Sequence, residues 1–185
     1  VYNKGYTDKK HLRIETKAGI RTLQLHVSFG KVRSVAVDMG KGAVGEDLTL
    51  AIAGETVTVT PVNVGNPHAV LFVEDMANAP LTTLGPQIER HEAFPEGTNV
   101  EFVQVKDRTN LRMRVWERGS GVTMACGTGA CASVLAAVRK GFCPAGETVF
   151  VELDGGTLEI LVSPDNTVTM TGPAETVYEG ETNLC

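Results

Sequence analysis

Hydrophobic and polar residues alternate along much of this chain, which is the pattern of half-buried β-strands. Near the start, Gly19 and Gly30 separate stretches of this kind and predict a meander of short strands. Residues 40–55, which contain several glycines, are expected to form a loop. The expected strands are residues 11–16, 20–27, 31–39, 56–64, 69–73, 99–105, 110–116, 148–153, 158–162 and 168–171.

Other stretches show the spacing of helices. Leucines and an isoleucine recur at helical intervals and predict an amphipathic helix over residues 81–91, which Pro95 would end. Residues 130–138 are small and apolar on nearly every face, and a basic pair and Gly141 follow them. This pattern predicts a buried helix over about residues 127–141, with a cationic last turn and a glycine stop.

Composition indicates a globular chain that binds neither nucleic acid nor membranes. Hydrophobic residues make up 42% of its 185 residues, enough for a sizeable core. The net charge is -5 and the basic residues form no stripe, which argues against nucleic acid and anionic membrane surfaces. The sequence shows neither a membrane span nor a signal core, so a cytoplasmic location is expected. The 4 cysteines lack CxxC spacing, which favours reduced thiols and no metal site.

Cys126 stands where the strand at residues 110–116 gives way to the buried helix. The N–H groups of residues 127–129 would lack intrahelical partners, and the positive end of the helix dipole would face the thiol. This position is expected to lower the thiol pKa and to hold an anion. A small, inert residue filling a tight turn explains the local pattern equally well, so both interpretations stay open at this point.

The chain also contains a weak internal repeat. Residues 1–5 resemble the last turn of a helix, and Lys4-Gly5-Tyr6 matches Lys140-Gly141-Phe142, with similar strands after each. Such a match predicts two similar halves, although chance could produce it because helix stops before strands are common. If the halves correspond, another helix opened by its own cysteine would precede Val1.

Several motifs together carry a family resemblance. They are Gly65-Asn66-Pro67-His68, Gly97-Thr98-Asn99-Val100-Glu101-Phe102, Glu117-Arg118-Gly119-Ser120-Gly121 and Ala125-Cys126-Gly127-Thr128-Gly129-Ala130. In this order they resemble diaminopimelate epimerase, a pyridoxal-independent amino-acid epimerase family of lysine and peptidoglycan precursor biosynthesis. The resemblance covers essentially the whole chain, and the glycine-cysteine motif alone would not be specific.

The resemblance implies an α+β fold of two pseudo-symmetric halves, each a strongly bent sheet or barrel wrapped round a central helix. Residues 1–39 would be a remnant of the N-terminal half. Residues 40–171 would form the complete C-terminal half, with its central helix at about 127–141, and residues 172–185 would return to the N-terminal half. The chain would then be a C-terminal portion that lacks the first catalytic cysteine, and would be inactive alone.

The resemblance also implies the chemistry. Inverting an α-carbon requires a proton to leave one face and another to arrive on the opposite face, which suits two thiols. Cys126 is expected to be one of these acid/base groups. The backbone N–H groups of Gly127 and Thr128 would hold the reacting carboxylate, and no cofactor is implied. The substrate would be diaminopimelate, interconverted between its LL and meso forms.

The other motifs would recognise the distal end of that substrate. By resemblance, Asn66, Asn99 and Arg118 would bind its carboxylate, and Glu117 its ammonium group. Without the family, turn chemistry and a solvated ion pair explain these residues. His68 could orient a catalytic thiol or fill a polar pocket. A homodimer formed through the first half is a further implication.

The sequence departs from the family at Val122, where a Glu is common, which removes a carboxylate near the site. The remaining cysteines, Cys131, Cys143 and Cys185, are expected to be structural. Alternative functions are a related pyridoxal-independent racemase or isomerase of another small acid, and a truncation that binds a ligand without catalysis.

Overall fold

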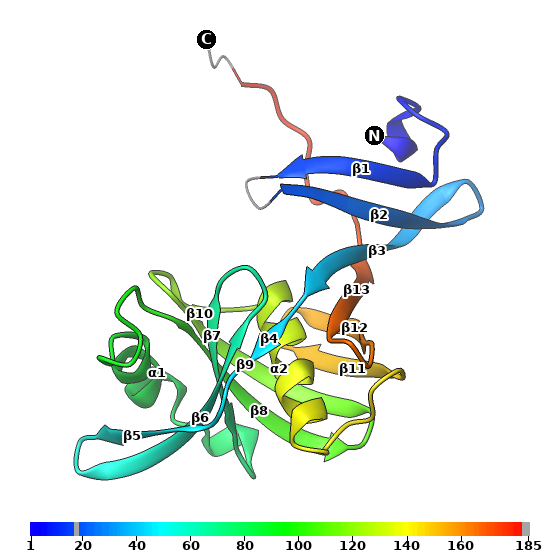
Figure 1. Ribbon diagram of the computed structural model, residues 1–185. Helices are drawn as coiled ribbons and strands as arrows, with labels where there is room; N and C mark the ends of the chain where they lie inside the picture. Colours follow the sequence, from blue (N-terminus) through cyan, green and yellow to red (C-terminus); the bar gives the residue numbers. More distant parts are fainter. Residues whose placement is uncertain (17–18, 183–185) are drawn as a thin grey trace. The chain divides into compact units, whose positions relative to one another are not determined.

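The computed structural model describes residues 1–16 and 19–182 (Figure 1). They form two compact units. One comprises Val1–Val37 with the described residues from Thr171 onward, and the other comprises Asp38–Met170. The sequence pattern and the family resemblance predicted domain boundaries after residues 39 and 171. The correspondence of these units to a remnant and a complete half of a pseudo-symmetric fold stays a prediction.

The smaller unit contains an antiparallel meander, as its alternating pattern indicates. Its elements are the 3₁₀ helix η1 (Tyr2–Lys4) and the strands β1 (His11–Thr16), β2 (Gly19–Ser28) and β3 (Lys31–Lys41), whose last residues belong to the larger unit. Apolar side chains such as Leu12, Leu23 and Val35 line a groove of about 390 Å³. One face of this sheet is therefore apolar, and little helical structure covers it.

The larger unit is built on a continuous mixed sheet. Its strands follow the order β13, β12, β11, β9, β8, β7, β6, β4, with β10 added to β9 and β5 to β6. The pairs β7–β8 and β9–β11 are parallel. The strands are β4 (Ala43–Val44), β5 (Leu48–Ile52), β6 (Glu55–Asn63), β7 (Pro67–Phe72), β8 (Asn99–Asp107), β9 (Asn110–Glu117), β10 (Gly121–Thr123), β11 (Thr148–Leu153), β12 (Gly156–Val162) and β13 (Thr167–Pro173).

The helix α2 (Gly127–Arg139) is the centre of the larger unit, with strands packed around it (Figure 1). Its small residues, including Ala130 and Ala136, are fully buried, which lets strands approach from several sides. Gly42 shows how close this approach is, because a Cβ there would lie 2.3 Å from Leu135 Cδ1. The predicted helix at 127–141 is confirmed and ends slightly earlier than expected.

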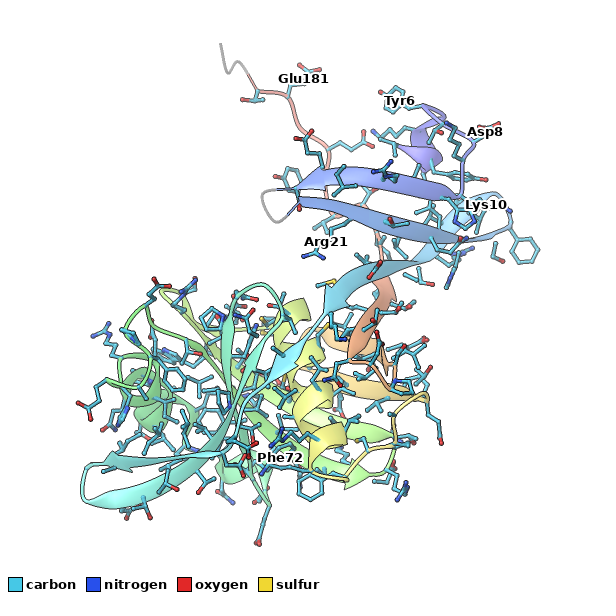
Figure 2. All side chains as sticks on the ribbon, in the orientation of Figure 1. Tyr6, Asp8, Lys10, Arg21, Phe72 and Glu181 are labelled. Atoms are coloured by element: carbon cyan, nitrogen blue, oxygen red, sulfur yellow. The ribbon has the colours of Figure 1, made fainter. Side chains whose placement is uncertain are left out.

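The C-terminal end of α2 is closed by a glycine and an aromatic pair. Gly141 takes a left-handed conformation with φ 74°, the same value that Gly5 takes after η1. Phe72 lies at this end of the helix (Figure 2), where its ring meets Phe142 edge-on at 5.0 Å. Gly5 and Gly141 thus take the same left-handed conformation, which L-residues rarely adopt, while the correspondence of two halves stays a prediction.

The helix α1 (Leu81–Glu89) packs on a second apolar cluster at the other side of the sheet. Leu81 and Ile88 are buried, as their helical spacing predicts. The predicted amphipathic helix is confirmed and ends at Glu89, two residues before the expected end. Pro86 lies within this helix.

Short elements account for most of the differences from the expected pattern. The loop expected at residues 40–55 contains β4 and β5, and the alternation of Leu48, Leu50 and Ile52 was a missed strand signal. The short strand β10 and the 3₁₀ helix η2 (Met76–Asn78) were also missed, since so few residues carry no periodicity. No helix among residues 1–16 and 19–182 is long and apolar enough to span a membrane.

Replacing Gly42 by alanine is expected to lower the free energy of unfolding by about 1–3 kcal/mol, the usual cost of overpacking a core. The added methyl group would displace Leu135, which is 1% exposed and packed in the core around α2. Urea unfolding followed by circular dichroism measures the change. Gly180→Ala is the control, since its Cβ would make only an ordinary contact of 3.6 Å. An unchanged urea midpoint for Gly42→Ala would contradict the close approach to α2.

Candidate active site

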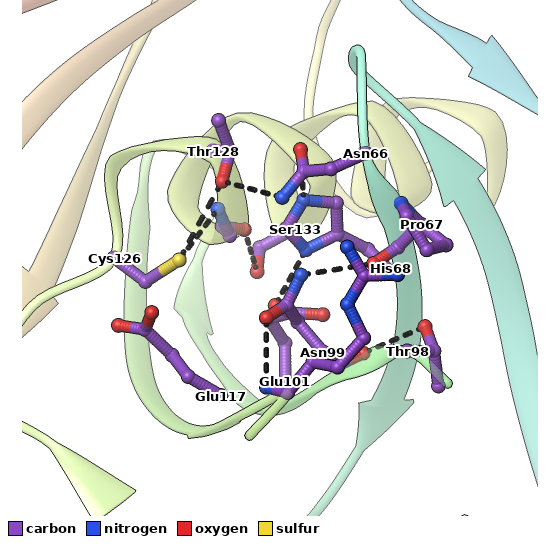
Figure 3. Close-up of polar contacts among 12 residues, drawn as sticks. Asn66, Pro67, His68, Thr98, Asn99, Glu101, Glu117, Cys126, Thr128 and Ser133 are labelled. Atoms are coloured by element: carbon purple, nitrogen blue, oxygen red, sulfur yellow. Dashed lines mark hydrogen bonds and ion pairs between the residues drawn. The ribbon is translucent and has the colours of Figure 1, made fainter. Parts of the chain in front are cut away.

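Cys126 occupies the N-cap position of α2, shortly after β10. Its backbone is extended, with φ -140° and ψ 106°, and the chain enters the helix directly after it. The Gly129 N–H donates a hydrogen bond to Cys126 Sγ at 3.3 Å, and the Thr128 hydroxyl oxygen lies 3.6 Å from the sulfur (Figure 3). The thiol thus takes the place of the Ser or Asp side chain that commonly caps a helix.

Burial determines the ionisation of this thiol. Loss of water raises the pKa of Cys126 from 9.0 to about 11, although hydrogen bonds from Thr128 and Gly129 lower it. The nearby carboxylates of Glu101 and Glu117 raise it further. The expectation of a lowered pKa is therefore wrong, because desolvation of the thiolate outweighs the helix terminus. At neutral pH Cys126 is protonated and can donate a proton.

Polar contacts connect Cys126 to a buried histidine. Asn66 lies just before β7, with Nδ2 3.4 Å from Thr128 Oγ1 and Oδ1 3.0 Å from His68 Nε2. His68 is 1% exposed, and its Nδ1 lies 2.7 Å from Glu101 Oε1 (Figure 3). His68 therefore sits in a polar pocket, and Asn66 and Thr128 stand between it and Cys126.

The parallel pairing of β7 and β8 creates this pocket. His68 is in register with Asn99, so Glu101, two residues further along β8, faces the same side of the sheet. Glu101 lies beneath the first turn of α2, because a Cβ at position 129 would come within 2.8 Å of Oε1. Gly129 thus leaves room for the carboxylate near the positive end of the helix dipole.

Asn99 ties the turn after β9 to its neighbours. Its Oδ1 accepts a hydrogen bond from Arg118 N at 3.0 Å, and its Nδ2 donates to the Pro67 carbonyl at 3.0 Å. The Arg118 side chain donates to the Glu96 carbonyl at 3.0 Å. Asn99 therefore positions backbone, while one of its amide protons remains for a ligand.

Glu117 ends β9 on the side of the thiol. The Thr123 hydroxyl donates to Glu117 Oε1 at 2.5 Å, which fixes the carboxylate. Figure 3 shows Glu117 and Cys126 beside each other, at the same end of the sheet as Asn66 and Asn99. The structure thus gathers these predicted residues around the first turn of α2. Val122 lies on β10 and is 40% exposed.

Sequence reasoning missed Glu89, which holds the same turn from α1. Its carboxylate accepts hydrogen bonds from Trp116 Nε1 at 2.6 Å and Gly119 N at 2.9 Å. The Trp116 indole, and then the Gly119 N–H, hold the pKa of Glu89 below its ordinary value despite burial. Glu101 was missed in the same way. For Glu101 the available signal was an acidic residue within an apolar stretch, because a buried acid needs partners, whereas Glu89 stands among polar residues and gave no such signal.

The other described cysteines pack in the core. Cys131 and Cys143 are 0% and 3% exposed among the apolar residues around α2. Cys185 lies outside the described residues. Within the described part of the chain, no group of three or more His, Cys, Asp or Glu side chains is arranged to hold a metal ion.

Comparisons with known proteins identify the family of this chain. The diaminopimelate epimerase family model matches residues 60–177. The chain belongs to the diaminopimelate epimerase family. A diaminopimelate epimerase from Phocaeicola vulgatus is 46% identical, over 100% of this chain and 70% of the relative. Another, from Geobacillus kaustophilus, is 46% identical over 97% of this chain and 67% of the relative. The resemblance inferred from the motifs is confirmed.

Solved structures show that this member of the diaminopimelate epimerase family shares its fold with more distant proteins. A hydroxyproline epimerase from Agrobacterium vitis matches 93% of the chain at a TM-score of 0.73 and 18% identity. A phenazine biosynthesis protein of the PhzF family from Enterococcus faecalis matches 99% at 0.67 and 16% identity. The chain spans 60% of the former and 68% of the latter. These matches confirm the α+β fold class.

The raised pKa of Cys126 predicts slow thiol alkylation at neutral pH. Iodoacetamide labelling should speed up about tenfold per pH unit between about pH 7 and 10, because only the thiolate reacts. Mass spectrometry of the Cys126 peptide measures this rate, and Cys126→Ser removes the signal. A plateau near pH 8 would mean that the helix terminus outweighs burial.

The same shift predicts how this thiol affects stability. The unfolded chain loses the thiol proton near the ordinary value of 9.0, whereas the folded chain keeps it up to about 11. The folded state therefore binds more protons in this window, and its stability falls as pH rises through it. Cys126→Ala should reduce the loss of unfolding free energy as pH rises. Urea unfolding across the same pH range measures this loss.

Proposed function

We propose that this chain supplies one acid/base thiol of a cofactor-independent epimerase that interconverts LL- and meso-diaminopimelate. The observation that carries the proposal is Cys126 at the N-cap of a buried helix, in a chain of the diaminopimelate epimerase family. The residues expected to bind substrate gather at the same end of the sheet. Epimerisation of this compound would serve lysine and peptidoglycan precursor synthesis.

The proposed step removes the proton from one face of the α-carbon and delivers a different proton to the opposite face. A base on one face takes the α-proton, and Cys126 Sγ–H delivers a proton to the other face, leaving a thiolate. The protonated state of Cys126 at neutral pH suits the delivering role. In the reverse direction the thiolate takes the proton back. The helix start receives the substrate carboxylate as negative charge develops, through the N–H groups of Gly127 and Thr128.

A second acid/base group is required, because one thiol cannot serve both faces of the same carbon. Cys131 and Cys143 are buried in the core around α2 and do not qualify. We assign this role to a second cysteine, distinct from the four in this chain, that opens the equivalent helix of the other half. The chain alone is then expected to be inactive. No electron-sink cofactor is part of this mechanism.

Recognition of the distal end rests on the turn after β9. Arg118 offers a guanidinium fork to a carboxylate, and Asn66 and Asn99 offer amide donors. Glu117, fixed by Thr123, would pair with the distal ammonium group. A small acid without a second amino-acid group would have no use for this pair of charges, which favours diaminopimelate over the substrate of another racemase. A homodimer and a cytoplasmic location complete the proposal.

Deuterium exchange tests the two-thiol mechanism. The chain alone, incubated with diaminopimelate in deuterated water, should show no exchange at the α-carbon by NMR. A longer protein that adds an upstream cysteine helix should exchange and epimerise, and Cys126→Ala in that protein should abolish epimerisation. Epimerisation by the chain alone would overturn the mechanism.

Arg118→Lys in the longer protein tests distal recognition. Lysine keeps the charge but loses the bidentate fork, so KM for diaminopimelate should rise about tenfold or more with a smaller change in kcat. Steady-state kinetics with LL-diaminopimelate measure both constants. Arg90→Lys, outside the site, is the matched control. An unchanged KM for Arg118→Lys would remove this residue from substrate binding.

A further inference from the structure

Glu101 is a buried acid to which the proposed mechanism gives no role. The side chain is 0% exposed, and its Oε1 pairs with His68 Nδ1 at 2.7 Å. Its Oε2 has no hydrogen-bond partner among the described residues. Such a pair contributes little net stability, because removing both groups from water costs about as much as their attraction returns. Its retention beneath the catalytic helix calls for another explanation.

The donor-to-acceptor directions of the neighbouring hydrogen bonds explain the presence of this buried acid. Asn66 Oδ1 faces His68 Nε2, and an amide oxygen can only accept, so this orientation of the amide requires a proton on Nε2. A further proton must then lie between Nδ1 and Glu101 Oε1, because two bare acceptors would not approach to 2.7 Å. This proton fixes the ring with Nε2–H toward Asn66.

The same polarity continues toward the thiol. Because Asn66 Oδ1 accepts from His68, its Nδ2 faces Thr128 Oγ1 and donates to it. The Thr128 hydroxyl proton is then free to point at Cys126 Sγ, 3.6 Å away. In this arrangement each hydrogen bond in the series donates in one direction, from the Glu101–His68 pair to the sulfur, along the contacts drawn in Figure 3.

We propose that Glu101 is a positioning residue that, through His68 and Asn66, directs the Thr128 hydroxyl to donate to Cys126 Sγ. The donated hydrogen bond stabilises the thiolate that remains after Cys126 has given up its proton. If Glu101 did not hold the shared proton, His68 Nε2 could accept instead, the Asn66 amide would reverse, and Thr128 would donate to Asn66. The catalytic meaning of this inference rests on the proposed function. The hydrogen-bond geometry behind it does not depend on that function.

The proton on His68 is tested directly in the unchanged chain. Long-range ¹H–¹⁵N NMR correlations of the histidine rings should show protonated Nε2 for His68 at neutral pH. The His68→Gln variant assigns the signal by its loss. An unprotonated Nε2 would overturn the proposal, and this outcome needs no variant of Glu101 to fold.

A double-mutant cycle tests the link to the thiol. Thr128→Val should slow labelling of Cys126 by methyl methanethiosulfonate at pH 8 about fivefold, the effect of losing one hydrogen bond. In a Glu101→Met background the same change should have less than about a twofold effect, because Thr128 no longer donates to the sulfur. Glu101→Gln, whose amide can donate to His68 Nδ1, should restore the fivefold effect.

A merely structural role for Glu101 would give additive effects in Glu101→Met, and this outcome would overturn the proposal. A Glu101→Gln variant that behaves like Glu101→Met would also overturn it. Urea unfolding confirms that each variant is folded before labelling. The labelling requires no epimerase activity, so a failure of the proposed diaminopimelate reaction in the exchange experiment is distinguished from a failure of this inference.

Discussion

The burial of α2 is the constraint on which the rest of the larger unit depends. Small residues along the helix let strands pack against it on several sides, and Gly42 has no side chain because Leu135 fills that space. The N-terminus of this enclosed helix lies beside the starts of β7 and β8 and the end of β9. The site is therefore placed where Cys126 caps the helix and where β7, β8 and β9 supply polar residues.

The same burial sets the chemistry of the thiol. A helix N-terminus favours a thiolate, but removal of water disfavours it more strongly, and the result is a protonated sulfur at neutral pH. The hydrogen bonds from Gly129 and Thr128 are then most important after the proton has left.

Much of the fold could be predicted from sequence because periodicity and helix stops are local. The strands around the meander and the helix ending near Gly141 follow directly from such patterns. β10 and η2 could not be predicted, because elements of 3 residues are too short to show a hydrophobic period. The motif residues Asn66, Asn99, Glu117 and Arg118 were identified by resemblance, whereas Glu89 and Glu101 were not, because their partners are distant in sequence and meet only through strand pairing and the packing of α1. The predicted lowering of the Cys126 pKa was wrong, because the burial that raises this pKa depends on the packing of the complete core.

Gly129 and Glu101 constrain each other's evolution. A carboxylate oxygen occupies the space that any side chain at position 129 would need, 2.8 Å from the place of its Cβ. Alanine at 129 would have to displace the Glu101 carboxylate, and its Cβ would also lie 3.2 Å from Cys126 Sγ. Replacing Glu101 alone would therefore not open this position, because the acid and the thiol together confine the first turn of the helix.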